Sequence, residues 1–203
     1  MTKTFAIHVK DFPSFSITQV EQRVVLHYMR IQTNTSKFYI MEFQEGVGDC
    51  PFRIYVEYGR MGSPPRKHER YFRSRLEARK EFDRTLTTKH KKGYELILIE
   101  EDWDDFSHLM PIEDSIPNSD SLPPTIYTPL GKLSEIQIQR GIHILNEIEQ
   151  RLRNGREDII DLSNQFYSVI PVALGSQIDK GCLLDTVEKV DAKKEWLNQM
   201  IYG

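Results

Sequence analysis

The sequence predicts an α+β fold, in which a small antiparallel sheet with one packed helix precedes a small all-helical region. Two patterns predict this order. Apolar residues alternate with a period of two before residue 60, and they recur at three- and four-residue spacing after residue 130. The composition, with 39% hydrophobic and 28% charged residues, is typical of a globular chain. The 203 residues are enough for one large domain or two small ones.

Strands are expected in the first half of the chain. Residues 24–31 and 36–46 each place bulky apolar side chains on one face by alternation. Residues 52–60, with the sequence FRIYVEYGR, alternate most regularly. The prolines at positions 64 and 65 forbid continuation of that strand in the centre of a sheet.

One helix is expected to pack on this sheet. It begins at Ser74, because the sequence SRLE forms a capping box in which Glu77 reaches back to the cap. Ala78, Phe82 and Leu86 follow at four-residue spacing and form an apolar stripe. A glycine at position 93 ends the helix, and residues 94–100 are expected to form a closing strand.

The second half is expected to be helical. The segment from Asp102 to Pro129 has many acids and five prolines, which predicts an extended linker. Helices are then expected from Ser134, over residues 159–171, and over residues 183–201. Three helices in this length form a small bundle whose buried area is marginal for folding alone.

Charge is distributed unevenly along the chain, although the net charge is only -3. Residues 53–92 contain thirteen Lys or Arg and five Asp or Glu, whereas residues 99–121 contain eight acids and no Lys or Arg. This pattern indicates a basic face followed by an acidic connector. The alternative interpretation is an ordinary solvated surface.

Several classes of protein are not expected. No apolar stretch approaches the ~20 residues that span a bilayer, and the N-terminus lacks the apolar core of a signal peptide. Two distant cysteines and six scattered histidines predict a reducing compartment and no metal site. No glycine-rich phosphate loop is present.

Two stretches resemble known domains. The segments RIQTNTSKFYIMEF, FRIYVEYGRMG and KHKKGYE, with the capped helix between the last two, resemble the WGR domain. Tyr58 stands at the position of the motif tryptophan, and Gly59 and Arg60 match the motif. PLGKLS at 129–134 and LSNQFYSVIP at 162–171 resemble the helical regulatory domain of DNA-dependent poly(ADP-ribose) polymerases.

The resemblance implies four segments: an N-terminal extension (1–21), a WGR domain (22–101), an acidic Pro-rich linker (102–128) and a partial regulatory domain (129–203). That family has a further helix before PLGKLS and continues into a catalytic domain, and neither is matched here. We therefore expect no catalytic residue, no metal and no cofactor in this chain; NAD is expected only where a catalytic domain is supplied elsewhere.

The resemblance also implies a site for nucleic acid at the end of the strand 52–60. In that family the motif aromatic residue packs on the end of a DNA strand break. An aromatic residue beside a glycine can form a stacking platform, and cations nearby can attract phosphate. The candidate residues are Tyr58, Gly59, Arg60, Lys37, Arg66, Lys67, Arg70 and Arg73. Two alternatives stay open: Tyr58 belongs to the core, and Arg60 is an internal strut.

These observations leave three functional hypotheses. In the first, a non-catalytic protein binds DNA break ends or a partner through its WGR domain, and the helical domain makes interdomain contacts. The second is a structural scaffold subunit in a larger assembly. The third is a fragment of a DNA-dependent NAD⁺ ADP-ribosyltransferase in DNA repair. A nuclear location is expected, with a cytoplasmic or cytoskeletal assembly as the alternative.

Overall fold

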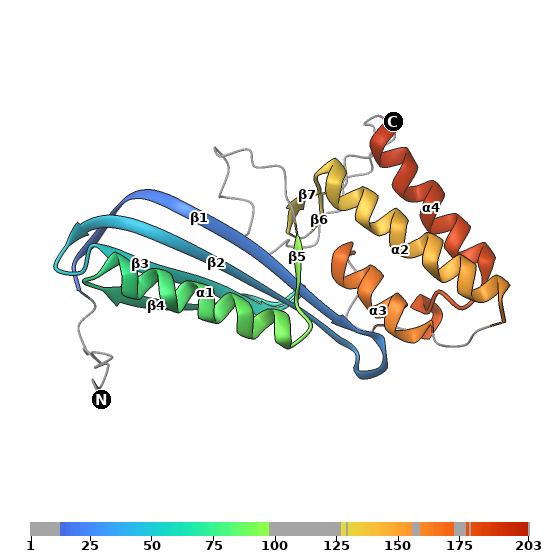
Figure 1. Ribbon diagram of the computed structural model, residues 1–203, viewed down its shortest axis with the longest axis horizontal. Helices are drawn as coiled ribbons and strands as arrows, with labels where there is room; N and C mark the ends of the chain where they lie inside the picture. Colours follow the sequence, from blue (N-terminus) through green and yellow to red (C-terminus); the bar gives the residue numbers. More distant parts are fainter. Residues whose placement is uncertain are drawn as a thin grey trace.

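The computed structural model describes residues 13–97, 127–128, 130–155, 159–172, 178 and 180–202. A long twisted sheet with one helix forms one end of an elongated molecule, and the remaining helices form the other end (Figure 1). The elements in chain order are β1 (Phe15–Arg30), η1 (Ile31–Thr33), β2 (Thr35–Gly48), β3 (Phe52–Arg60), β4 (Arg66–Phe72), α1 (Arg75–Lys91), β5 (Glu95–Ile97), β6 (Tyr127–Thr128), β7 (Gly131–Lys132), α2 (Glu135–Arg153), α3 (Ile160–Val169), η3 (Lys180–Cys182) and α4 (Val187–Tyr202).

The sheet has the strand order β4-β3-β2-β1-β5, and all its pairs are antiparallel. The predicted α+β class with an antiparallel sheet, one packed helix and a helical region is therefore confirmed. Two features differ from the prediction. β1 starts at Phe15, so it crosses the boundary expected between residues 21 and 22, and β4 is a strand that the sequence did not indicate. Most of the expected linker, residues 102–126, lies outside the described residues.

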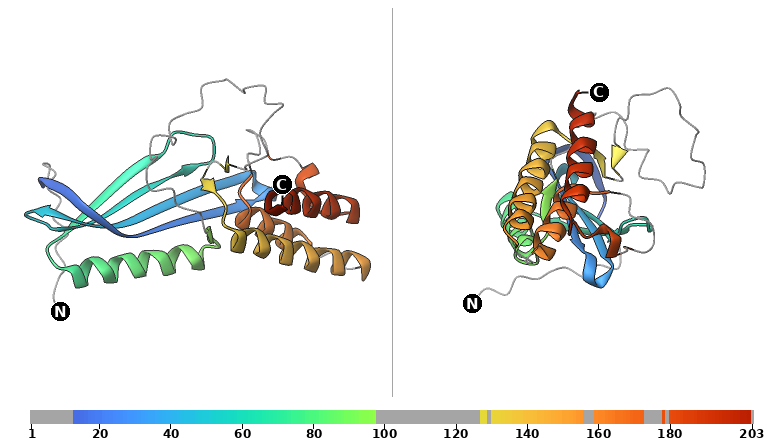
Figure 2. Two further views of the ribbon diagram at one scale, coloured as in Figure 1. Left: turned by 90° about the horizontal axis from the view of Figure 1, so that it is seen from above. Right: turned by 90° about the vertical axis from the view of Figure 1, so that its right-hand side faces the viewer.

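α1 lies along one face of the sheet (Figure 2). Its cap is the predicted one, because the Ser74 hydroxyl accepts a hydrogen bond from the Glu77 amide. Ala78 and Phe82 are buried against the sheet, while Leu86 is partly buried. The helix ends before Gly93, whose φ of 84° lies in the left-handed region where glycine costs least.

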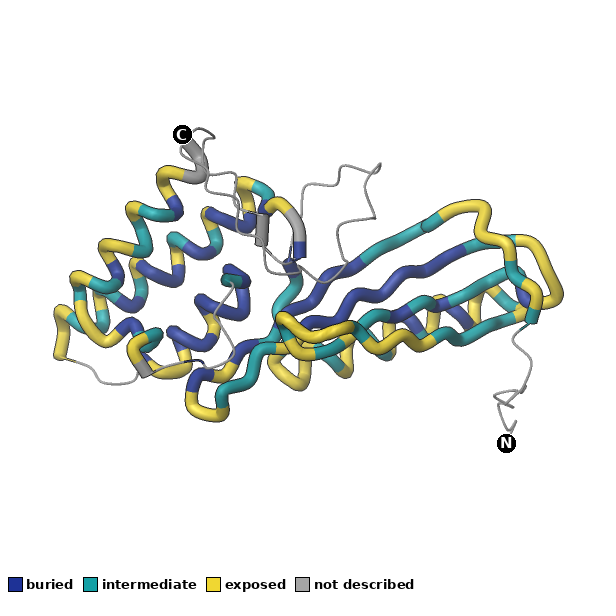
Figure 3. The backbone as a smooth tube through the Cα atoms, turned by 180° about the vertical axis from the view of Figure 1, so that it is seen from behind, coloured by how far each residue is buried: buried dark blue, intermediate teal, exposed yellow. Residues whose placement is uncertain are grey.

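Neighbouring residues of the long strands serve two different cores. On the face that α1 covers, Tyr39 and Met41 of β2 pack with Phe82. On the other face, Phe38 and Ile40 pack with residues of α2, α3 and α4. Figure 3 shows the buried stretch running along β1 and β2 toward the inner sides of the helices. The strand pleat produces this division, because successive side chains point to opposite faces.

The helical region shares its core with the sheet. Buried residues of α2, α3 and α4 form one cluster with Val25, Met29, Ile31, Phe38, Ile40 and Ile97 of the sheet and its connections. α2 begins at the predicted cap, where the Ser134 hydroxyl accepts from the Gln137 amide. The small bundle therefore gains from the sheet the buried area that its own helices lack.

α3 also accepts hydrogen bonds from the end of β1 and the start of η1, beyond the β1 residues that pair with β5. The Met29 amide donates to the Ser168 hydroxyl at 2.9 Å, and the Ile31 amide donates to the Asn164 side-chain oxygen at 2.8 Å. Amides two residues apart on a strand are about 6.6 Å apart, and side chains four residues apart on a helix are about 6 Å apart. The match lets one helix take the place of a neighbouring strand.

Candidate nucleic-acid interface

Tyr58 lies near the end of β3, on the face of the sheet that α1 covers. It is directly opposite Tyr39 of β2 and Arg66 of β4. Its ring centroid is 6.0 Å from that of Tyr39, and 36% of the residue is exposed. Tyr58 therefore rests on the edge of the core and keeps an exposed part of its ring for contact with a ligand.

Gly59 follows Tyr58 and lies beside the Phe38 ring. A Cβ atom built at Gly59 would lie 3.4 Å from that ring, an ordinary van der Waals contact, so the packing around Gly59 does not by itself require glycine. The Phe38 ring is buried in the core shared with the helices.

Lys89 extends the aromatic surface from the last turn of α1. Its Nζ atom lies 3.5 Å from the centroid of the Tyr39 ring and 4.8 Å from that of Tyr94. Such contacts with the faces of aromatic rings stabilise a cation by about 0.5–2 kcal/mol, depending on how much water is excluded. We use the name tyrosine–lysine site for Tyr39, Tyr58 and Lys89 together with Lys37, Arg66 and Lys92.

The cations of this site crowd one another. Burial lowers the pKa of Lys89 to about 8, and the charges of Lys92 and Lys37 act in the same direction. Among the described residues, no carboxylate pairs with Lys37, Arg66, Lys89 or Lys92. Like charges without counterions make a site that gains stability when an anion binds.

The structure gathers some of the predicted site residues and separates others. Lys37 is directly opposite Arg60, and Arg66 is directly opposite Tyr58, so both lie at the tyrosine–lysine site. Arg70 shares the face, but its guanidinium is paired with Glu81 of α1.

Lys67 and Arg73 lie elsewhere. Lys67 is opposite Glu57 and on the other face of the sheet, where the two side chains form an ion pair at 3.3 Å. Arg73 follows Phe72, which pairs with Phe52 at the far end of β3. Lys67 is therefore separated from Tyr58 by the sheet, and Arg73 by the length of β3, so neither belongs to a compact site around Tyr58.

Arg60 contacts the connection between β1 and β2. Its Nη2 atom donates to the side-chain oxygen of Asn34 at 3.1 Å, and the same oxygen accepts from the Ile178 amide at 2.9 Å. Asn34 has a φ of 47°, a conformation that asparagine tolerates better than most residues. This contact ties the exposed Arg60 side chain to the β1–β2 connection, and through Asn34 to Ile178.

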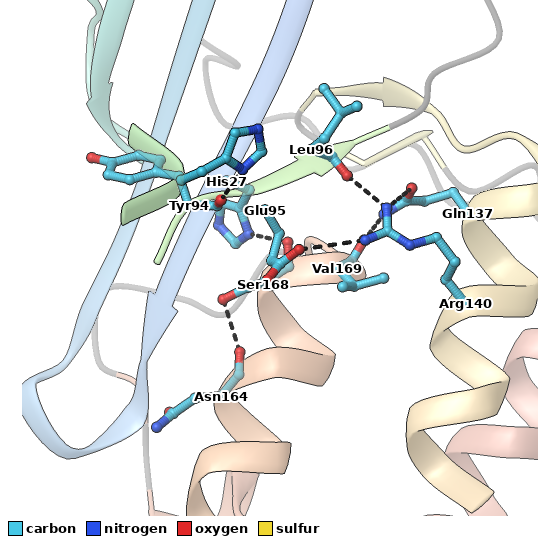
Figure 4. A network of polar contacts seen from close by, with 10 residues as sticks. His27, Tyr94, Glu95, Leu96, Gln137, Arg140, Asn164, Ser168 and Val169 are labelled. Atoms are coloured by element: carbon cyan, nitrogen blue, oxygen red, sulfur yellow. Dashed lines mark hydrogen bonds and ion pairs between the residues drawn. The ribbon is translucent and has the colours of Figure 1, made fainter. Parts of the chain in front are cut away.

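Further polar contacts join sheet and helices beside this site (Figure 4). The Arg140 guanidinium donates to the Leu96 carbonyl at 3.0 Å and pairs with Glu95 at 3.4 Å. Buried His27 lies 3.0 Å from the Ser36 hydroxyl and 3.3 Å from the Ser168 carbonyl. Ser36 precedes Lys37, so this network reaches the edge of the tyrosine–lysine site.

Two searches of the described part of the chain gave no candidate. This part contains no group of three or more His, Cys, Asp or Glu side chains arranged to hold a metal ion. No helix in the described ranges is long and apolar enough to cross a bilayer.

Sequence comparisons agree with this architecture. The family model for the WGR domain matches residues 22–100, and the model for the poly(ADP-ribose) polymerase regulatory domain matches residues 125–202. In this chain, the α+β module is thus a WGR domain, and the helical module that follows it is a regulatory domain. The chain has the domain order of the poly(ADP-ribose) polymerase family, as its motifs implied.

Individual proteins similar to this chain are poly(ADP-ribose) polymerases from animals and plants. Poly [ADP-ribose] polymerase 1 of Gallus gallus is 43% identical over 75 residues, which cover 36% of this chain and 7% of that protein. Poly [ADP-ribose] polymerase 2-A of Oryza sativa subsp. japonica is 25% identical over 223 positions, covering 86% of this chain and 33% of that protein. Poly [ADP-ribose] polymerase 2 of Arabidopsis thaliana is 22% identical and covers 87% of this chain and 35% of that protein. The chain spans only a part of each relative.

The sequence alone missed Lys89, Lys92 and Tyr39 as members of the site. The helical spacing placed Lys89 only in a general basic run, and Tyr39 only in an apolar strand. The register of β2 with β3 and the last turn of α1 bring them to Tyr58. Pairing across strands is the signal that a single sequence does not contain.

Proposed function

We propose that the WGR domain binds the end of a broken DNA strand, preferably a 5′-phosphorylated one, at the tyrosine–lysine site. One observation carries the proposal: a partly exposed tyrosine ring lies among Lys37, Arg66, Lys89 and Lys92, and no carboxylate of the described residues pairs with these cations. The ring offers a surface for the terminal sugar or base, and the cations attract the terminal phosphate.

The binding free energy expected from each contact shows which variants test the proposal. Removal of the Tyr58 ring costs about 1–3 kcal/mol of binding free energy if the ring stacks on nucleic acid. Removal of one cation that contacts phosphate lowers the salt dependence of binding by about one unit in log K per log salt. A tryptophan offers more area than a tyrosine, so Tyr58→Trp is expected to strengthen binding.

Fluorescence anisotropy with labelled DNA tests the proposal. The wild-type chain is titrated onto a duplex with a 5′-phosphorylated nick and onto the intact duplex, at several salt concentrations. We expect a preference for the nick that Tyr58→Ala removes and that Lys37→Ala weakens. Lys67→Ala and Arg73→Ala serve as matched controls, because both remove a cation outside the site. Equal losses in the controls, or no salt dependence at all, would refute the assignment.

A second proposal concerns a protein partner of the helical region. Ile136 of α2 and Ile160 of α3 are 66% and 40% exposed, so each places an apolar side chain on the surface of the helical region. We propose that a scaffold role in a larger assembly uses these positions. Co-purification of a stable complex that Ile136→Glu disrupts is the expected result, and an isolated, monodisperse chain in every fraction contradicts it.

We further propose that the chain acts in DNA repair as part of a DNA-dependent ADP-ribosyltransferase system in the nucleus. The domain order carries this proposal. We infer that transfer itself uses a catalytic domain supplied elsewhere, because the two family models that match this chain are those of the WGR and regulatory domains. The purified chain incubated with labelled NAD is therefore expected to give no labelled product, and turnover would contradict this.

A further inference from the structure

Ser63 lies in the connection between β3 and β4, next to the tyrosine–lysine site. It ends a tight turn in which its amide donates to the Arg60 carbonyl at 3.1 Å. Gly62, the third residue of this turn, has a φ of 77°, which is typical of a type II turn. Ser63 is exposed, and its hydroxyl makes no hydrogen bond with the described part of the chain. The turn therefore fixes where this hydroxyl lies and leaves it open to another molecule.

The sequence after Ser63 is typical of a segment that a protein kinase accepts. Two prolines follow Ser63, and then the exposed cations Arg66 and Lys67, which an acidic surface of a kinase can bind. Pro64 keeps Ser63 in extended backbone conformations and has no amide hydrogen. A kinase that acts here must therefore accept a residue without an amide hydrogen after the target serine, as proline-directed kinases do. Thr128 also precedes a proline, but a glycine stands at the position that Arg66 has after Ser63.

Three cations lie near Ser63. The Cα atoms at the two ends of such a turn lie within about 7 Å of each other, so Arg60 is close to Ser63. Lys37 of β2 is directly opposite Arg60. Arg66 of β4 is directly opposite Tyr58, so all three cations share the face of the tyrosine–lysine site. A phosphate on Ser63 adds about −1.5 to −2 charge units at pH 7, and these cations can pair with it through charge-assisted hydrogen bonds.

We propose that Ser63 is a phosphorylation site for a proline-directed protein kinase, and that the phosphate blocks the binding of a DNA end. The second part rests on the proposed function, because the phosphate and the DNA end compete for Lys37 and Arg66. In the transfer, the Ser63 oxygen attacks the γ-phosphorus of ATP, and the bond from that phosphorus to the β–γ bridging oxygen breaks. The hydroxyl proton passes to a carboxylate of the kinase, and ADP leaves. Hydrolysis of the phosphoserine by a phosphatase restores the hydroxyl, so the block is reversible.

Labelling with a purified proline-directed kinase and radiolabelled ATP tests the site. The full chain is incubated with both, and the labelled peptide is identified by mass spectrometry. We expect the label on Ser63, so that Ser63→Ala removes it and Thr128→Ala leaves it unchanged. Pro64→Ala keeps the hydroxyl but restores an amide hydrogen, so its labelling should fall by about tenfold or more. Label mainly on another residue, or undiminished labelling of Ser63→Ala or Pro64→Ala, overturns the assignment.

Phosphorus NMR tests the contact with the cations independently of DNA. The second pKa of phosphoserine is about 6, and neighbouring cations lower this pKa because they favour the doubly charged form. We expect a lower phosphoserine pKa in the folded chain than in the same chain unfolded in urea. Arg66→Gln removes one of the cations and should bring the two pKa values closer together. Equal pKa values in the folded and the unfolded wild-type chain overturn the contact.

Fluorescence anisotropy then compares the phosphorylated and unphosphorylated chains on the duplex with a 5′-phosphorylated nick. We expect phosphorylation to lower the affinity by about tenfold or more, and to lower the salt dependence by about two units in log K per log salt. Phosphatase treatment should restore both, and Ser63→Ala taken through the same kinase treatment should bind as the untreated wild type does.

The outcomes separate this inference from the proposed function. Unchanged affinity of the phosphorylated chain for the nick overturns the blocking role of Ser63 and leaves the proposed function intact. An unphosphorylated chain without preference for the nick contradicts the proposed function, and the blocking role with it. In that case, labelling of Ser63 and a lowered phosphoserine pKa still support the modification site.

Discussion

His27 gives the molecule a dependence on pH that can be worked out from its surroundings. The side chain is only 1% exposed and lies between β1 and α3, where its two ring nitrogens contact the Ser36 hydroxyl and the Ser168 carbonyl. Burial lowers the pKa of His27 from 6.5 to about 4, more strongly than the hydrogen bonds to backbone carbonyls of α3 raise it. The folded protein therefore holds the neutral imidazole.

The sign follows from proton counting. Between pH 6.5 and pH 4 the unfolded chain binds a proton at His27 and the folded chain does not, so acid favours unfolding. The full difference of about 2.5 pKa units corresponds to about 3 kcal/mol, reached below pH 4. Between pH 7 and pH 5 the same relation gives a loss of about 2 kcal/mol. Above pH 6.5 this contribution is fully present.

Urea denaturation at pH 7 and pH 5 measures the effect, with wild type and His27→Gln compared at each pH. Glutamine keeps a donor and an acceptor but has no proton to gain, so other titrating groups cancel in the comparison. We expect the wild type to lose about 2 kcal/mol more than the variant over this interval. Equal losses in the two proteins would show that His27 is accessible to protons in the folded state, and the reasoning from burial would be wrong.

The remaining predictions concern the packing of α3 against its neighbours. Asn164→Ala leaves the Ile31 amide without its acceptor and is expected to cost about 1–3 kcal/mol in the free energy of unfolding, whereas Gln165→Ala, on the exposed side of the same helix, should cost less than about 0.5 kcal/mol. Gly141→Ala places a Cβ atom 2.6 Å from the Ile170 side chain and is expected to cost about 1–3 kcal/mol. Thermal melting of the three variants checks both statements, and an unchanged midpoint for Asn164→Ala or Gly141→Ala contradicts the corresponding contact.

Elements with a strong local pattern could be predicted from the sequence. β3 alternates over its whole length, and α1 and α2 have serine caps followed three residues later by Glu or Gln, so their positions were confirmed. β4 has the sequence RKHERYF, which is charged on both faces and has no apolar alternation. Such an edge strand is charged because its free edge faces solvent, and the same charge hides it from a search for apolar patterns.

Tertiary features were harder to predict. The first half of β1 is polar and contains two register shifts, so its alternation is broken where the strand begins. The core that β1, β2, α2, α3 and α4 share depends on residues more than a hundred positions apart, such as Met29 and Ser168. The site also depends on contacts between residues distant in sequence. Tyr58 could be recognised from its motif, but the position of Lys89 near it could be found only from the packing of α1 on the sheet.

Successive residues of β2 pack alternately into two cores: Phe38 and Ile40 into one, Tyr39 and Met41 into the other. This alternation limits which insertions and deletions the gene can tolerate. Loss or gain of a single residue in β2 would exchange the two sets of side chains and disorder both ends of the molecule together. Recombination at the boundary between the sheet and the helices would also destabilise the protein, because each half would then expose the apolar face that the other half covers. The shared core therefore favours inheritance of the two halves as a pair.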